Sequence, residues 1–261
     1  MKIEDIIKEI ESCEECKKIF PQKFRKRGYT FYADHVANYE FMMVLQNPLF
    51  NNKRHAAEKS EADRASSLRD RIKVHQSFFS KWFLSGPNKS FVKRFLELFK
   101  EKGLIAFDNL KDYVNGQFFS DFYVTDLIKY WCYTKEIKDN HRKHAIKHLR
   151  KEIEAVKPRL MLVFSTRVWD VFLKEFESEY NLQPIRGWKT IKKQGDPERS
   201  EKKLANAHGF LFQGRYDKNR KFFVLPLFHL SVNARYMLLR DSYFQYMKEG
   251  LEDYLKIVVK R

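Results

Sequence analysis

The sequence lacks several features that would assign it to a membrane, secreted or fibrous class of protein. No apolar run approaches the roughly 20 residues that a helix needs to cross a bilayer. The N-terminus lacks the charged, apolar and small-residue order of a signal peptide, and no repeat or low-complexity tract is present. Three cysteines are too few for a secreted disulfide scaffold. These absences lead us to expect a soluble, cytoplasmic protein.

Acidic residues are outnumbered by basic residues, 34 against 51, which gives a formal net charge of +17 and a pI of about 9.6. That balance favours a polyanionic partner, either nucleic acid or an anionic membrane. With 261 residues and 43% hydrophobic content, the chain can bury a large core and is not wholly disordered. We expect one globular domain over residues 1–261.

The pattern of apolar residues predicts strands that alternate with helices. The four predicted strands are residues 40–46, 122–131, 160–165 and 222–230. The predicted helices are residues 3–10, 91–99, 143–156, 168–180 and 241–258. This alternation predicts an α/β fold with a mainly parallel, four-stranded central sheet flanked by helices. We also expect a basic insertion near 51–76, either helical or mobile, and a polar loop near 189–203.

Polar residues follow three of the predicted strands and are not explained by the strands themselves. They are Gln46-Asn47-Pro48, Thr125-Asp126 and His229-Leu230-Ser231. Ligands of parallel sheets bind beyond the carboxyl ends of the strands. These three segments are therefore the candidate functional site.

The same segments resemble motifs of the uracil-DNA glycosylase superfamily, and their layout is closest to its iron–sulfur branch. VLQNPLF at 44–50 resembles the first catalytic motif, FYVTDLIK at 122–129 the pyrimidine-reading strand, and LPLFHLS at 225–231 the closing His-Pro-Ser motif. Glu-Ala-Val-Lys-Pro-Arg at 154–159 and Ala207-His208-Gly209 are further matches in the same order. The resemblance spans nearly the whole chain. It implies a three-layer sandwich that flips a nucleotide out of DNA and hydrolyses its glycosidic bond.

Two residues would carry the chemistry that the resemblance implies. Asn47 would position the attacking water, although an Asn before proline is also a common turn residue. An amide orients water but hardly deprotonates it, so we expect dissociative chemistry in which the base leaves early. His229 would donate a hydrogen bond to the pyrimidine O2, where negative charge develops; its alternative role is to cap the sheet.

Asp126 stands where the family usually has an Asn that matches uracil. An ionised carboxylate only accepts hydrogen bonds, so it is repelled by O4 of uracil and suits the N4 amino group of cytosine. A proton on Asp126 or on cytosine N3 would add a bond at N3. The alternative is that Asp126 pairs with Lys129 or with a core arginine and never meets a base.

The resemblance implies further contacts with the base and with DNA. Gln46 and Leu49 follow the first strand, and Leu49 replaces a Tyr that blocks C5 substituents in the strictest uracil branch. Phe83 would stack on the flipped base, although it is as easily a core residue. Ser231 and Arg235 would contact DNA, and the basic stretches 53–73, 186–203 and 215–221 would bind its phosphates.

Cys13-x-x-Cys16 has the spacing of metal ligands. With Cys132, this pair falls where three ligands of the family's [4Fe–4S] cluster fall, but the fourth cysteine is absent and Ala145 takes its place. His144 and His148 lie within reach on the same predicted helix. A histidine such as His148 completes a cluster, or the site holds zinc with three cysteines and one histidine, or the metal is lost.

We therefore expect a monomeric, nucleoid-associated DNA glycosylase that excises a C5-modified cytosine and leaves an abasic site. Such an enzyme would serve DNA repair or defence against phage DNA with bulky, for example glucosylated, cytosines. The alternatives are a uracil-DNA glycosylase of base excision repair, a catalytically weak DNA-binding module, and a basic membrane-surface protein. The last is disfavoured because no basic amphipathic anchor is present.

Overall fold

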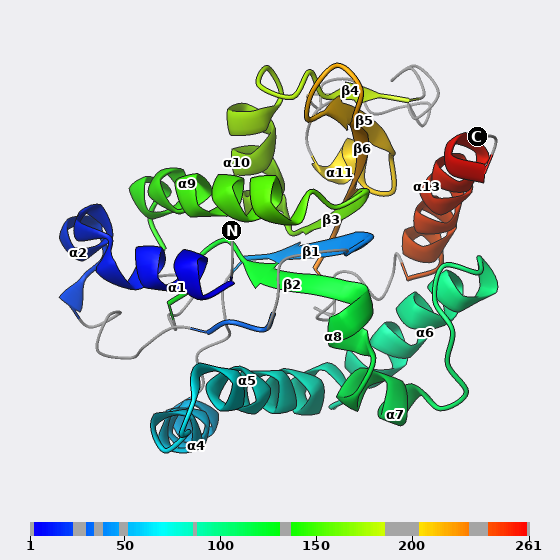
Figure 1. The fold of residues 1–261 in the computed structure, drawn as a ribbon. Helices are drawn as coiled ribbons and strands as arrows, with labels where there is room; N and C mark the ends of the chain where they lie inside the picture. The colour runs from blue at the N-terminus through cyan, green and yellow to red at the C-terminus, as the bar shows by residue number, and fades with distance from the viewer. Residues whose placement is uncertain are drawn as a thin grey trace. The chain divides into compact units, whose positions relative to one another are not determined.

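The computed structural model of this α/β protein describes residues 3–22, 30–33, 39–46, 52–85, 88–130, 137–185, 204–229 and 240–259. Its helices and strands form two compact units (Figure 1). The first comprises Met1–Trp82 and Val114–Pro158, and the second comprises Phe83–Tyr113 and Arg159–Arg261. Each unit has its own buried apolar residues and is described by itself.

The first unit is built on two parallel strands, β1 (Phe41–Leu45) and β2 (Phe122–Asp126). Every residue of both strands is buried, as expected for parallel strands that are covered on both faces. Their register pairs Phe41 with Phe122 and Leu45 with Asp126. The strands therefore end side by side, and Gln46 follows β1 at the same edge as Asp126.

Three helices of the first unit form a separate packed group. The N-terminal α1 (Ile3–Ser12) and α2 (Glu14–Ile19) both contact α9 (Asp139–Val156), as Figure 1 shows. Helix α1 buries Ile6, Ile7 and Ile10, which recur at helical spacing. Helix α9 ends at Lys157, which adopts a left-handed conformation with φ of 47° just before Pro158.

The predicted basic insertion near 51–76 is helical over its described residues. It forms α4 (Asn52–Asp63) and the first part of α5 (Leu68–Phe83). The two helices are joined by a buried polar contact, in which Glu58 Oε1 lies 2.9 Å from His75 Nδ1. The short α8 (Phe118–Asp121) precedes β2, and α7 (Leu110–Asn115) contributes residues to both units.

The second unit contains four strands in the order β3-β6-β5-β4. Strand β3 (Leu160–Phe164) is parallel to β6 (Lys221–Leu227), whereas β5 (Phe212–Arg215) is antiparallel to β6 and β4 (Gln183–Pro184) is antiparallel to β5. Four helices belong to this unit: α6 (Asn88–Glu101), α10 (Thr166–Phe176), α11 (Leu204–Ala207) and α13 (Arg240–Val259).

The predicted four-stranded, mainly parallel sheet is wrong in its strand count and in part of its direction. The described residues form six strands, and two of the strand pairings are antiparallel. Strands β4 and β5 have no apolar pattern that would predict them, because β4 has only two residues and β5 contains Gln213-Gly214-Arg215. The basic stretch 215–221 is largely a turn, in which Asp217 Oδ1 accepts hydrogen bonds from the backbone N–H groups of Asn219 and Arg220. The second predicted strand ends at Asp126 rather than at residue 131.

Two glycines allow α13 to approach the segment before β5. A Cβ on Gly209, whose φ is +76°, would lie 2.5 Å from the carbonyl carbon of Tyr246. A Cβ on Gly250 would lie 2.3 Å from the carbonyl oxygen of Gly209. Backbone atoms cannot move aside as a flexible side chain can, so both positions require glycine.

Gly209→Ala should therefore destabilise the protein more than Gly103→Ala. Both glycines have positive φ, so both alanines carry a similar backbone strain of about 1 kcal/mol. Only Gly209 has backbone atoms in the way, since a Cβ on Gly103 meets nothing within 4 Å. This steric clash should lower the free energy of unfolding of Gly209→Ala by about 1–3 kcal/mol more than that of Gly103→Ala. Denaturant unfolding measures the difference, and equal losses in both variants would contradict the close approach.

Candidate functional site

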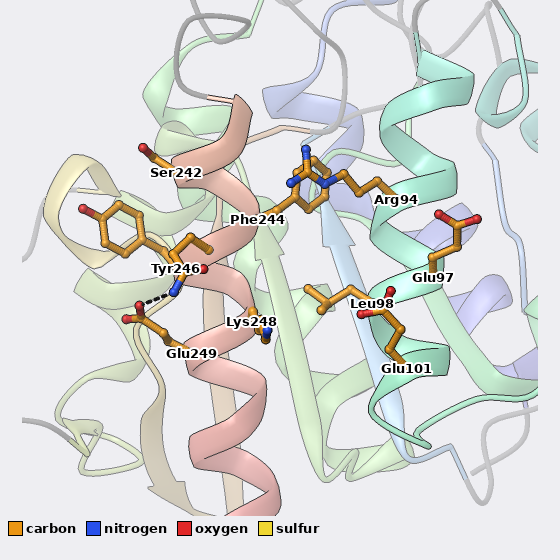
Figure 2. Close-up of a pocket in the computed structure, with 10 residues that line it drawn as sticks. Arg94, Glu97, Leu98, Glu101, Ser242, Phe244, Tyr246, Lys248 and Glu249 are labelled. Carbon is orange, nitrogen blue, oxygen red and sulfur yellow. Dashed lines mark hydrogen bonds between the residues drawn. The ribbon is translucent and has the colours of Figure 1, made fainter.

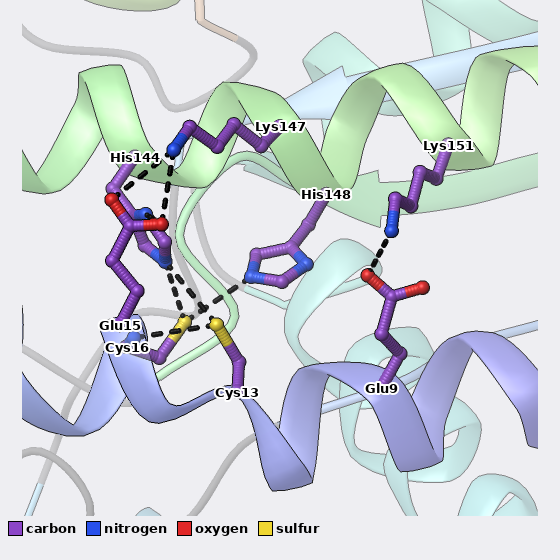
Figure 3. Close-up of polar contacts among 8 residues, drawn as sticks. All are labelled: Glu9, Cys13, Glu15, Cys16, His144, Lys147, His148 and Lys151. Atoms are coloured by element: carbon purple, nitrogen blue, oxygen red, sulfur yellow. Dashed lines mark hydrogen bonds and ion pairs between the residues drawn. The ribbon is translucent and has the colours of Figure 1, made fainter.

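Four metal-ligating side chains come together where α2 meets α9 (Figure 3). One ligand atom from each of Cys13, Cys16, His144 and His148 lies within 4.8 Å of all the others. Cys16 Sγ is 3.0 Å from His144 Nε2 and 3.2 Å from His148 Nε2, and Cys13 Sγ is 3.6 Å from His144 Nε2. The two cysteines are not joined as a disulfide. The cluster can therefore hold a metal ion.

Local structure explains how these side chains converge. Cys13 is the N-cap of α2, and its sulfur accepts a hydrogen bond from the backbone N–H of Cys16 at 3.3 Å. This turn points both sulfurs toward the same place. His144 and His148 are four residues apart on α9 and so lie on one face of that helix.

The cluster is largely sealed from solvent, and burial governs its protonation. His144, His148 and Cys16 are buried, whereas Cys13 is partly exposed. Burial raises the pKa of the Cys16 thiol and lowers the pKa of His148 to about 4. The imidazole of His148 is thus neutral at physiological pH, which is the form that binds metals. A bound cation would reverse the preference of the thiol and favour the thiolate.

Ion pairs surround the cluster and hold the same helices together. Glu15 Oε2 lies 3.4 Å from His144 Nδ1, on the side of the ring away from the sulfurs, and Lys147 Nζ donates to both carboxylate oxygens of Glu15 at 2.9 and 3.1 Å. Lys151 pairs with Glu9 one turn further along α9 (Figure 3). A carboxylate beside the second ring nitrogen is the usual orienting group of a metal-binding histidine.

The predicted ligand set is therefore confirmed in part. The structure brings Cys13 and Cys16 together with His148, as predicted, and adds His144 as a fourth member. Cys132 lies outside the described residues. A signal for the histidines was present in the sequence, because Cys-x2-Cys with a distant His-x3-His is a common zinc-ligand spacing.

Asp126 occupies the edge where β1 and β2 end. It is the last residue of β2, is buried, and lies beside Leu45 in the register. The backbone carbonyl of the adjacent Gln46, which is also buried, accepts a hydrogen bond from Ile128 N at 2.9 Å. Among the described residues, Asp126 Oδ2 has no hydrogen-bond partner. A buried, unsatisfied carboxyl oxygen is unfavourable unless a ligand or water meets it.

The alternative that Asp126 pairs with Lys129 is wrong in this structure. Lys129 Nζ forms a buried ion pair with Glu152 Oε1 at 2.7 Å. The same ammonium contacts the Thr125 hydroxyl and donates to the backbone carbonyl of Asp126 at 2.6 Å. Thr125 Oγ1 and the Tyr123 hydroxyl both donate to Glu152 Oε2, at 2.5 and 3.2 Å. Glu152 thus binds the buried polar groups of Lys129, Thr125 and Tyr123 around β2. The carboxyl of Asp126 takes no part in these contacts.

Burial raises the pKa of Asp126 from 3.8 to about 7. Lys129 and a hydrogen bond from Tyr32 oppose this rise, and the nearby carboxylates of Glu152 and Glu58 add to it. The carboxyl therefore titrates near neutral pH and can either donate or accept a hydrogen bond there.

His229 lies two residues beyond β6 in the second unit and is half-buried as a residue. Desolvation lowers its pKa to about 4, so the ring is neutral at physiological pH. Two hydrogen bonds fix the backbone of the preceding residue, Phe228. Its N–H donates to His208 Nδ1 at 3.2 Å, and the Tyr243 hydroxyl donates to its carbonyl oxygen at 3.0 Å. His208, part of the Ala-His-Gly match, therefore positions the backbone that leads into His229. Sequence reasoning had not assigned it this role.

The remaining predicted site residues have different outcomes. Phe83 is completely buried at the end of α5, so the structure places it among the core residues. The predicted site residues Asn47, Leu49, Ser231 and Arg235 and the polar loop near 189–203 lie outside the described residues.

A separate groove of about 760 Å³ runs between α6 and α13 in the second unit (Figure 2). The guanidinium of Arg94 lies over the Phe244 ring at 4.5 Å, and Gln245 donates to Glu249. Its charged lining residues are of both signs: Arg94, Lys248, Glu97, Glu101 and Glu249. This mixture gives the groove no preference for a polyanion such as DNA.

A scan of known protein families finds no model that matches this chain, and a search of curated proteins finds no match either. None of the described helices combines the length and apolar character needed to span a membrane. Function therefore has to be inferred from the residues and their geometry.

Asp126→Asn should change the pH dependence of stability. In the folded protein Asp126 keeps its proton up to about pH 7, whereas in the unfolded chain it loses the proton near pH 3.8. Stability of the wild-type protein should therefore fall as pH rises between these values, by up to about 4 kcal/mol. An amide does not titrate, so the variant should gain stability relative to wild type from pH 4 to pH 8.

Reversible denaturant unfolding at several pH values measures this effect. Asp112→Asn is the matched control, because it makes the same chemical change at an exposed position on α7. If the free energy of unfolding changed with pH in the same way in wild type and in Asp126→Asn, the raised pKa of Asp126 would be contradicted.

Proposed function

We propose that this protein is a monofunctional DNA glycosylase that flips out and hydrolytically excises a C5-modified cytosine. The observation that carries the proposal is the buried carboxyl of Asp126, which has one unsatisfied oxygen and lies beside Gln46 where two parallel strands end. Ligands of parallel sheets bind at this edge. The sequence resemblance to uracil-DNA glycosylases, with their three-layer sandwich fold, gives the site its reaction class.

The protonation of Asp126 fits the hydrogen-bonding edge of cytosine. Cytosine presents an amino donor at N4 and an acceptor at N3. A protonated carboxyl offers the complementary pair, because its carbonyl oxygen accepts from N4 and its hydroxyl donates to N3. A pKa of about 7 keeps this form populated at physiological pH. The proton shared at N3 also makes the base a better leaving group.

The roles of His229 and Asn47 come from the sequence resemblance, and the protonation state of His229 agrees with its role. His229, neutral at physiological pH, would donate a hydrogen bond to the base O2 as the glycosidic bond breaks. Asn47 would orient the attacking water. The net charge of +17 supports a DNA partner, to which the protein would bind as a monomer at the nucleoid. A metal in the cysteine–histidine cluster, as a [4Fe–4S] cluster or as zinc, would support the fold.

Excision of ordinary cytosine would destroy the host genome, so the target should carry a mark that distinguishes it. A C5 substituent is such a mark, and Leu49 replaces the Tyr that blocks this position in the strictest uracil branch. Bulky, for example glucosylated, cytosines occur in phage DNA. Defence against phage is therefore the proposed biological setting, with DNA repair as its alternative.

Uracil excision is the second candidate, and the raised pKa of Asp126 favours it too. A protonated carboxyl can donate to O4 and accept from N3 of uracil. An ionised Asp126 faces one unmatched acceptor in either base, N3 of cytosine or O4 of uracil, so excision of both bases should fall above pH 7. The two candidates are therefore separated by the bases that are excised.

The experiment uses oligonucleotides that carry uracil, cytosine, 5-methylcytosine, 5-hydroxymethylcytosine or glucosylated 5-hydroxymethylcytosine, followed by alkaline cleavage of abasic sites. We expect cleavage at a C5-modified cytosine and none at cytosine. Excision of uracil alone would establish the second candidate. Binding without excision of any base would identify a DNA-binding module that lacks turnover.

Asp126→Asn should lower excision of the modified cytosine and create or raise uracil excision. Held as in uracil-reading sites, the amide presents its N–H₂ to position 4, where it opposes the amino group of cytosine and matches O4 of uracil. A mispaired buried polar contact costs roughly 1–3 kcal/mol, or about one to two orders of magnitude in rate. Asp112→Asn is again the control. An unchanged preference in Asp126→Asn would show that this residue does not read the base.

His229→Ala provides a contrasting variant. It should lower turnover on every accepted base by about two orders of magnitude, because stabilisation at O2 does not depend on the group at position 4. The ratio of rates on two substrates should therefore stay constant in His229→Ala and change in Asp126→Asn.

A further inference from the structure

We propose that Cys13, Cys16, His144 and His148 form a mononuclear, tetrahedral zinc site that fastens α2 to α9. This ligand set replaces the four-cysteine iron–sulfur cluster that the sequence resemblance implies. The inference stands independently of the glycosylase proposal, because it rests on the four side chains and is tested by metal content.

The distances between the ligand atoms fit one small ion. Zinc binds thiolate sulfur at about 2.3 Å and imidazole nitrogen at about 2.0–2.1 Å, so tetrahedral geometry separates sulfur and nitrogen ligands by about 3.6 Å. Three of the four sulfur–nitrogen distances here are 3.0, 3.2 and 3.6 Å, and no two ligand atoms lie more than 4.8 Å apart. Shifts of up to about 1 Å would let all four atoms surround one zinc ion.

The same distances do not fit a four-iron cluster. In such a cluster each ligand binds a different iron at a corner of a cube, so the ligand atoms lie well apart around the whole cage. Here all four ligand atoms lie within 4.8 Å of one another, which leaves no room for four irons and four sulfides between them. Two sulfurs and two nitrogens in a tetrahedral arrangement are typical of zinc.

The site is of the structural kind. Four protein ligands fill a tetrahedral shell and leave no position for water or substrate, unlike catalytic zinc sites. Two ligands come from the start of α2 and two from α9, which also bind each other through the Glu15–Lys147 ion pair. The ion would therefore cross-link two segments that are more than 120 residues apart in the sequence, as the Cys16–His144 separation of 128 shows.

Metal analysis of protein purified without oxygen tests the proposal directly. We expect one zinc per chain and neither iron nor acid-labile sulfide. Exchange of zinc for Co²⁺ should give the visible absorption bands of tetrahedral cobalt with sulfur and nitrogen ligands. Removal of the metal by a chelator should lower the midpoint of thermal unfolding, and added Zn²⁺ should restore it.

Variants separate this ligand set from one that includes Cys132. Cys16→Ser and His148→Ala should each lose the bound zinc, whereas Cys132→Ser should retain one zinc per chain. His148→Cys guards against a variant that fails to fold, because it keeps four ligands. It should retain zinc, and its Co²⁺ form should show stronger sulfur-to-cobalt charge-transfer absorption than wild type.

Several results would overturn the proposal. They are iron and sulfide in the purified protein, loss of metal in Cys132→Ser, and absence of metal both as purified and after addition of Zn²⁺ or Co²⁺. Retention of zinc in both Cys16→Ser and His148→Ala would also overturn it, because the ion would then lie elsewhere.

Discussion

The buried ion pair between Lys129 and Glu152 is the interaction on which the polar interior of the first unit depends. Both charges are almost wholly removed from solvent, and their side chains meet at 2.7 Å. Burial of a charge is tolerated only when it is paired and hydrogen-bonded. Glu152 meets this condition through Thr125 and Tyr123, and Lys129 meets it through Thr125 and the backbone of Asp126. Loss of either partner would leave the other as an isolated buried charge beside β2.

Helix α9 connects this ion pair to the cysteine–histidine cluster. His144, His148 and Glu152 follow one another at intervals of four residues, so they lie along one face of the helix. A rotation or a slide of α9 would therefore displace the histidines and Glu152 together. A metal that fixes the two histidines against α2 would also fix Glu152, and through it Lys129 next to Asp126. The cluster would then act on the proposed base-reading site by positioning, without taking part in the chemistry.

The sequence predicted those features that local patterns encode. Apolar runs located β1, β3 and β6, and helical periodicity located α1, α9 and α13. Polar residues at strand ends made Asp126 and Gln46 candidates, and the register of β1 and β2 pairs Asp126 with Leu45, the residue before Gln46. The strand and helix predictions succeeded because a buried strand or an amphipathic helix must show its burial in its own residues.

Features that depend on distant partners were not predicted. The pairing of Lys129 with Glu152 joins a loop to a helix, and nothing near Lys129 in the sequence favours Glu152 over Asp126. His144 was noted as within reach, but only the fold shows that it meets both cysteines. Phe83 looked like one aromatic among 24 phenylalanines, and its complete burial is a property of packing. Strands as short as β4 follow the neighbour to which they pair and have no pattern of their own.

Under the proposed function, the absence among the described residues of a buried cation paired with Asp126 determines how the base is read. Lys129 is close enough to lower the pKa of Asp126, but its charge is already neutralised by Glu152, so desolvation prevails and the carboxyl titrates near pH 7. A direct ion pair with Lys129 would instead keep Asp126 ionised and able only to accept hydrogen bonds. The proton that Asp126 retains is the one that a bond to cytosine N3 requires. Glu152 would thus control base recognition indirectly, because it binds the lysine that would otherwise keep Asp126 charged.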